Sequence, residues 1–186
     1  MGDIFVWKIT GVSSLLQNST ASMFKPKDDG LKGGKTKYVD EDEAEIRINR
    51  NESGEVTLPS QAFRAGMQRA GSGRKIGKLT ARQVVSGGVF PQEEHIVLHD
   101  AKGKSFKSCS SIDKRRVVVG TSGVPRCRPR FDNWQCKLAM EIDTLLVKVE
   151  VITELLNLAG KIAGIGDFRP EKGGTFGRYT AELETK

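Results

Sequence analysis

The 186-residue chain has little of what metal sites, disulfide frameworks and most catalytic centres require. Its three cysteines are odd in number and show no CxxC spacing, which argues against a disulfide framework or a zinc site and favours a reducing compartment. No run of about 18 apolar residues occurs, so we expect no transmembrane helix. The opening MGDIFVWKIT lacks the regions of a signal peptide. These absences predict a cytoplasmic protein without a cofactor or metal and without a membrane partner.

Catalytic motifs are equally scarce. The glycine-rich segment GSGRKIGKLT (71–80) fails the phosphate-loop pattern because its spacing to Gly77-Lys78 is one residue too long and Leu79 replaces the required Ser or Thr. The only histidines, His95 and His99, lie in a strand-like pattern that puts them on one face, about 13 Å apart. A histidine of this kind is a candidate general base for RNA cleavage, but no spacing fixes such a geometry. We therefore predict no catalytic residues.

The order of predicted elements indicates the fold. Alternation predicts strands at 3–10 and 134–142, with Trp134 pointing into the core, and a last strand at 176–183. Shorter or less regular strands are expected at 46–51, 89–100 and 114–120. Helices are expected at 59–71, with Ser60 as N-cap, at 74–86 and at 146–163. Residues 120–131 are predicted to be irregular because Pro125 and Pro129 interrupt them.

Together these elements predict an α+β protein with a β-α-β-β-α-β core, in which two helices cover one face of a four-stranded antiparallel sheet. This is the ferredoxin-like or RRM-like arrangement. We expect a single RRM-like domain over 1–186, with a surface insertion at 17–58 and a basic hairpin and loop insertion at 100–131.

Basic residues are the most informative feature of the sequence. The formal charge is +7, and two runs, 64–82 and 101–130, contain many cations and almost no acids. Arginines beside aromatic residues suit single-stranded nucleic acid, whose unstacked bases accept aromatic side chains. The predicted nucleic-acid-binding residues of these runs are Arg64, Arg69, Arg74, Lys75, Lys102, Lys104, Lys107, Arg115, Arg116, Arg126, Arg128, Arg130 and Phe131.

The segment GIGDFRPEKGGTFGRY (164–179) adds three further cations beside the sheet, Arg169, Lys172 and Arg178. It runs from a helix into a strand, whereas a nucleotide-binding loop runs from a strand into a helix, so it is not predicted to hold a nucleotide. Its first glycines are predicted to end the preceding helix, and its later ones to allow positive φ or a close backbone approach. The glycines of this loop are Gly164, Gly166, Gly173, Gly174 and Gly177.

Three separated segments resemble the RAMP superfamily, the RRM-like proteins of CRISPR effector complexes. LPSQAFRAGMQRAG resembles the family's helix start, although Ser60 replaces the usual glycine and the order of Ala65 and Gly66 is reversed. The glycine-rich loop with its last strand resembles the family's C-terminal segment, and DIFVWKITGVSSLLQN its first strand.

The resemblance implies a backbone-subunit-like protein of antiviral defence, or a phage or mobile-element relative of one. Such a protein would bind guide RNA or single-stranded DNA without catalysis and form a filament, a homo-oligomer or a hetero-complex. In such an assembly the acidic 40–45 segment of a neighbouring subunit would receive the basic 101–130 segment. Two alternatives remain open: an RNA-processing endoribonuclease that uses His95 or His99, and a phage inhibitor that mimics a CRISPR subunit by binding protein.

Overall fold

The computed structural model describes residues 2–19, 40–119 and 122–184, with side chains for all of these except 117–119 and 122–125. In chain order the elements are β1 (Asp3–Gly11), β2 (Leu15–Leu16), α1 (Asp40–Glu45), β3 (Thr57–Pro59), α2 (Gln61–Ala70), β4 (Lys75–Ile76), β5 (Leu79–Thr80), α3 (Ala81–Gly88), β6 (Val89–Pro91), β7 (His95–Val97), β8 (Ser111–Val119), β9 (Ser122–Phe131), β10 (Gln135–Ile142), α4 (Val149–Ile162), the 3-10 helix η2 (Pro170–Lys172) and β11 (Tyr179–Leu183).

The main sheet has the strand order β11-β1-β10-β6, and every neighbouring pair is antiparallel. Alternation gives it one buried face: Trp7 and Ile9 of β1 pack beside Leu138 and Met140 of β10. The predicted α+β class is confirmed, and so are the strands expected at 3–10 and 134–142. The ferredoxin-like or RRM-like arrangement of the core stays a prediction.

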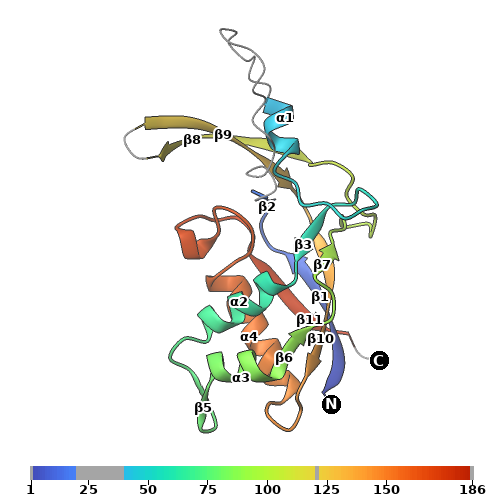
Figure 1. Ribbon diagram of the computed structural model, residues 1–186, viewed down its shortest axis with the longest axis vertical. Coiled ribbons are helices and arrows are strands. Elements are labelled where there is room, and N and C mark those ends of the chain that lie inside the picture. The colour runs from blue at the N-terminus through green and yellow to red at the C-terminus, as the bar shows by residue number, and fades with distance from the viewer. Residues whose placement is uncertain (1, 20–39, 120–121, 185–186) are drawn as a thin grey trace.

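Helices α2, α3 and α4 cover one face of this sheet, as Figure 1 shows. Amphipathic spacing explains why: Phe63 and Met67 of α2 and Leu155 and Leu156 of α4 are all buried. The predicted continuous helix at 74–86 is wrong, because β4 and β5 form a hairpin there. Helix α3 begins only after Thr80, whose side chain caps it together with Gln83 in a capping box.

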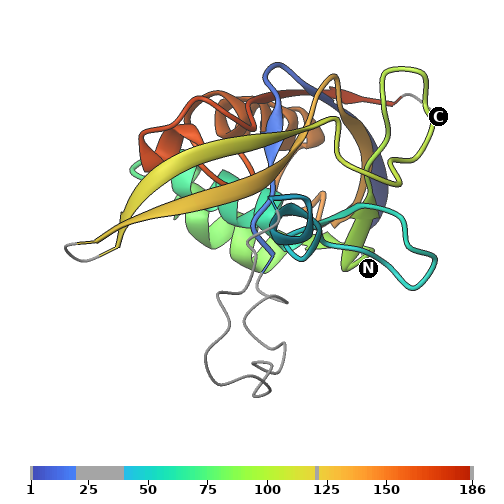
Figure 2. The same ribbon diagram turned by 90° about the horizontal axis from the view of Figure 1, so that it is seen from above.

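The hairpin β8–β9 forms a second sheet with β2 and extends from the main sheet, with α1 packed against it (Figures 1 and 2). The prediction of irregular structure at 120–131 is therefore wrong for 122–131, and residues 120–121 lie outside the described residues. The backbone groups of Pro129 face β2, where its carbonyl accepts from the Gln17 N–H at 3.2 Å, and Pro125, four residues earlier, faces the same edge. Prolines at these positions remove no N–H from the β8–β9 ladder, since successive residues of a strand face opposite edges.

Two other sequence predictions need correction. The strand expected at 89–100 is divided, because β6 pairs with β10 in the main sheet whereas β7 pairs with β3. The described part of the expected surface insertion at 17–58 is not wholly on the surface, since Gln17, Ile48 and Leu58 are buried. In place of the strand expected at 46–51 there is a single bridge between Arg50 and Val56.

The outer edge of β11 is closed by a side chain from α4. The Asn157 amide donates to the Ala181 carbonyl at 2.8 Å, and its carbonyl oxygen accepts from the Ala181 N–H at 2.9 Å. One side chain thus occupies the two backbone groups through which this strand would pair with another chain.

Changing Asn157 to Asp is expected to lower the free energy of unfolding by about 2 kcal/mol, because the carboxylate has no N–H for the Ala181 carbonyl. Urea unfolding followed by circular dichroism measures the effect. Gln92→Glu, which makes the same change of charge at an exposed residue, is the control. Equal urea midpoints for the two variants would contradict the role of Asn157.

Candidate nucleic-acid interface

The two faces of the β8–β9 hairpin carry different side chains. The ladder sets Asp113 opposite Arg128 and Arg115 opposite Arg126, with Arg130 next along the same face. Because side chains of paired residues point to the same side of a sheet, these cations share one surface. We call it the arginine face: Arg115, Arg126, Arg128 and Arg130.

The arginine face lies against the glycine-rich loop, residues 164–178. The guanidinium carbon of Arg115 is 4.9 Å from the ring centroid of Phe168 and 5.1 Å from that of Phe176. Both rings are half-buried, so part of each remains open to solvent. Arg128 donates to the Asp167 carboxylate at 2.5 Å and is only 11% exposed. The hairpin is thereby joined to the loop by one cation–π cluster and one ion pair.

Backbone hydrogen bonds hold the loop in a single conformation. The Gly164 N–H donates to the Ala159 carbonyl and ends α4, as the sequence predicted. The Ile165 N–H donates to the Gly177 carbonyl at 2.9 Å, and the Asp167 N–H donates to the Leu16 carbonyl at 2.8 Å. A rigid loop can present its aromatic rings at low entropic cost.

A polar cleft of about 490 Å³ lies where the arginine face meets the turn after β1. Ser14, Arg130 and Phe176 are among the residues that line it. The pKa of Asp132, also in the lining, is lowered first by the hydrogen bond from the Ser14 hydroxyl and then by Arg130. Arg178 is exposed at the end of the loop, and its carbonyl accepts from the N–H groups of Val12 and Ser13, which also line the cleft.

The opposite face of the hairpin is occupied by an acidic helix of the same chain. Lys114 forms an ion pair with Asp40, at the start of α1, and the Cys127 thiol donates to the same carboxylate at 3.2 Å. The hydrogen bond from Lys114 has the larger effect in lowering the pKa of Asp40, and the one from Cys127 lowers it further. The prediction that the acidic 40–45 segment receives the hairpin of a neighbour is corrected here, because the contact is made within one chain.

Several residues predicted to bind nucleic acid have structural roles instead. Phe131 is 0% exposed and packs edge-on against Phe106, so its ring is not available to a base. Arg64 donates to the carbonyls of Ser86 and Val89, where α3 meets β6. Arg128 is largely covered by its ion pair. Phe131 lies on the buried side of β9, together with Cys127 and Pro129 and opposite the arginine face.

The two basic runs do not converge on one surface. Arg74 pairs with Glu154 and Lys75 is exposed in β4, at the end of the molecule away from the β8–β9 hairpin (Figure 1). Lys102 and Lys104 lie in a separate exposed loop that is organised by the Asp100 carboxylate. Three of the other predicted residues form ion pairs: Lys107 pairs with Glu55, and Arg69 and Arg169 both pair with Glu171. The remaining two, Arg116 and Lys172, are exposed without an ion pair to any described residue.

Sequence reasoning missed Phe168 and Phe176 as members of the interface. The available signal was their position beside arginine and glycine in FRP and FGR, within a loop already identified as cationic. Nothing in the sequence indicated that Arg115 contacts both rings, since it lies 53 residues from Phe168 and 61 residues from Phe176 along the chain.

The ion pair between Arg128 and Asp167 gives a test of how firmly the hairpin is attached. Arg128→Ala is expected to lower the free energy of unfolding by about 2 kcal/mol, because it leaves a partly covered carboxylate without its partner. In a double-mutant cycle with Asp167→Ala, a coupling energy of about 1–3 kcal/mol is expected. Additive effects in urea unfolding would show that the pair does not hold the hairpin on the loop.

The described residues contain no group of three potential metal ligands, and none of the described helices is long and apolar enough to cross a membrane. His95 lies in β7 opposite Pro59, whereas His99 bridges to Ser105 and Gln135, so the two histidines contact different parts of the molecule. Comparison of the chain with protein-family models and with curated proteins found no match.

Proposed function

We propose that this protein binds single-stranded nucleic acid, without catalysis, on the arginine face and the adjoining glycine-rich loop. One observation carries the proposal: Arg115 lies over two neighbouring, half-buried aromatic rings, directly opposite Arg126, on a hairpin that extends from the body. Such an arrangement offers stacking surfaces for bases beside cations for phosphates.

The ion pairs of the interface cations indicate which of these side chains are available to phosphates. Arg126 and Arg178 form no ion pair with any described residue. Arg115 and Arg130 pair with Asp113 and Asp132, but each is 41% exposed. Exposed ion pairs contribute only about 0–1 kcal/mol, so Arg130 can exchange its carboxylate for a phosphate at small cost, whereas the partner of Arg115, Asp113, is only 10% exposed.

The outer face of the main sheet is a poorer candidate for stacking bases. In the described part of the chain its only large exposed aromatic is Phe90, a single ring, whereas the glycine-rich loop presents two neighbouring rings, Phe168 and Phe176. We therefore place the bound strand on the hairpin and loop rather than across the sheet. The proposal includes the assembly of several subunits along one strand, as the resemblance to RAMP backbone subunits implies.

Fluorescence anisotropy with labelled oligonucleotides of about 30 nucleotides tests the proposal at about 50 mM salt. Single-stranded DNA or RNA is expected to bind more tightly than a duplex of the same sequence, since a duplex hides its base faces. Equal affinity for duplex and single strands would show attraction by charge alone. Cleavage of the RNA that is lost in a His95→Ala/His99→Ala variant would instead support the endoribonuclease alternative.

A further inference from the structure

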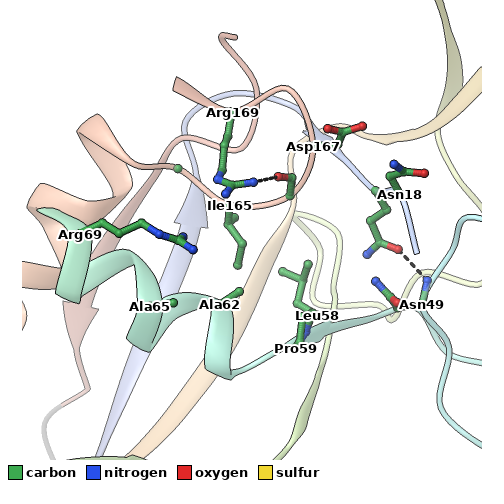
Figure 3. Close-up of a pocket in the computed structure, with 13 residues that line it drawn as sticks. Asn18, Asn49, Leu58, Pro59, Ala62, Ala65, Arg69, Ile165, Asp167 and Arg169 are labelled. Atoms are coloured by element: carbon green, nitrogen blue, oxygen red, sulfur yellow. Dashed lines mark hydrogen bonds between the residues drawn. The ribbon is translucent and has the colours of Figure 1, made fainter. Parts of the chain in front are cut away.

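A second cavity, distinct from the polar cleft, lies on the other side of the glycine-rich loop. It has a volume of about 340 Å³ and is enclosed by α2, β3 and the start of the loop (Figure 3). Its floor is apolar, formed by Leu58, Ala62, Ala65 and Ile165. The two alanines of α2 are spaced so that they share one side of the helix, and their small side chains leave the space open.

Three amide side chains converge on one end of this cavity. Gln17 is buried and fixed, since it accepts from the Asn49 N–H at 2.9 Å and donates to the Thr57 carbonyl at 2.9 Å. Asn18 uses its oxygen to accept from Arg47, which leaves its amide hydrogens for a ligand. The side chain of Asn49 has no hydrogen bond to any described residue. Figure 3 shows Asn18 and Asn49 on one side of the cavity and Arg69 on the other.

The charged groups of the cavity are already paired. Arg69 and Arg169 both form ion pairs with Glu171, at 3.3 and 3.1 Å, and Asp167 is paired with Arg128 of the hairpin. Two arginines share one carboxylate, but Arg69 lies on the side of the cavity away from Asn18 and Asn49, so the groups left to a ligand at the amide end are neutral and lie beside an apolar floor. Amides match the donors and acceptors on the edge of a nucleobase, whereas a phosphate requires unpaired cations or N–H groups.

We propose that this cavity takes up a single nucleobase of the bound strand and reads its edge through Asn18 and Asn49. The inference rests on the proposed function and adds base preference to it. The volume is in the range of small-ligand pockets, and the base would lie on Leu58, Ala62 and Ala65. The Arg128–Asp167 pair joins the cavity wall to the arginine face, so the two proposed binding surfaces are neighbours.

Binding of labelled single-stranded oligo(A), oligo(C), oligo(U) and an abasic strand of equal length tests the inference. The wild-type protein is expected to bind at least one homopolymer about fivefold or more tightly than the others, and the abasic strand most weakly. Ala65→Leu fills the cavity and is expected to remove the preference among homopolymers, while the dependence of binding on salt stays unchanged. Gln61→Leu, on an exposed position of the same helix, is the matched control.

Asn49→Ala removes only the free amide and adds no volume to the cavity. It is expected to weaken the same preference, so the test still applies if Ala65→Leu fails to fold. Equal binding of all homopolymers by the wild type, or a preference that persists in both variants, would overturn the base pocket while leaving strand binding intact. Failure of every oligonucleotide to bind at low salt would refute the proposed function itself, and the base pocket with it.

Discussion

Replacing both Arg126 and Arg178 with glutamate is expected to weaken the binding of single-stranded nucleic acid by about 100-fold at low salt. Together with Lys172, the two arginines are the interface cations that form no ion pair with any described residue, so they contribute much of the unopposed charge. Each substitution removes one positive charge and adds a negative one beside the strand. Fluorescence anisotropy at constant salt measures the change.

Arg82→Glu, which makes half of this change in net charge, is the control for this result. Arg82 is exposed in the first turn of α3, so the same reversal of charge occurs on another part of the surface and near a helix N-terminus that tolerates an acid. A loss of affinity of the same size in Arg82→Glu would show that net charge, and not the arginine face, determines binding.

Gly177→Ala is expected to lower the free energy of unfolding by about 4 kcal/mol, or to prevent folding. Gly177 has φ of 68°, and a Cβ there would lie 1.7 Å from the Ile165 carbonyl oxygen. The clash is with backbone, which cannot move aside without breaking the hydrogen bond that Ile165 donates to Gly177. Thermal and urea unfolding both measure the loss.

Gly173 supplies the control within the same loop. Its φ of 75° is just as unfavourable for alanine, but no atom lies within 4 Å of its added Cβ. Gly173→Ala should therefore cost only the conformational strain, about 1 kcal/mol. Similar losses for the two variants would contradict the close packing that we assign to Gly177.

The sequence predicted those elements whose signals are local. The alternation from Trp134 onward located β10, and apolar spacing located α2 and α4, with ends within a few residues of the observed ones. Ser60 precedes α2 as predicted, but its hydroxyl makes no capping hydrogen bond. The hairpin strand β9 was missed because Pro125 and Pro129 normally interrupt a strand. Whether a proline is tolerated depends on which edge its N–H would face, and that depends on pairing with β2 and β8.

The interface was predicted only in part, for a related reason. Charge runs identify Arg115, Arg126 and Arg130 as surface cations, but the same runs contain Arg128, whose partner Asp167 lies 39 residues away. Which of these cations bind carboxylates and which are left for phosphates becomes clear only from the tertiary contact between the hairpin and the glycine-rich loop. Phe131 shows the same limit for aromatics, because its burial depends on Phe106 in a preceding loop.

The dependence of strand binding on salt tests the central claim most directly. If the arginine face holds about four to six phosphates, a plot of the logarithm of the association constant against that of the salt concentration should have a slope of about −3 to −4. The Arg126→Glu/Arg178→Glu variant should reduce the steepness of that slope by about 1.4, since two contacts are lost. A wild-type protein that binds no single strand at about 20 mM salt, or a slope that the double variant leaves unchanged, would contradict the account.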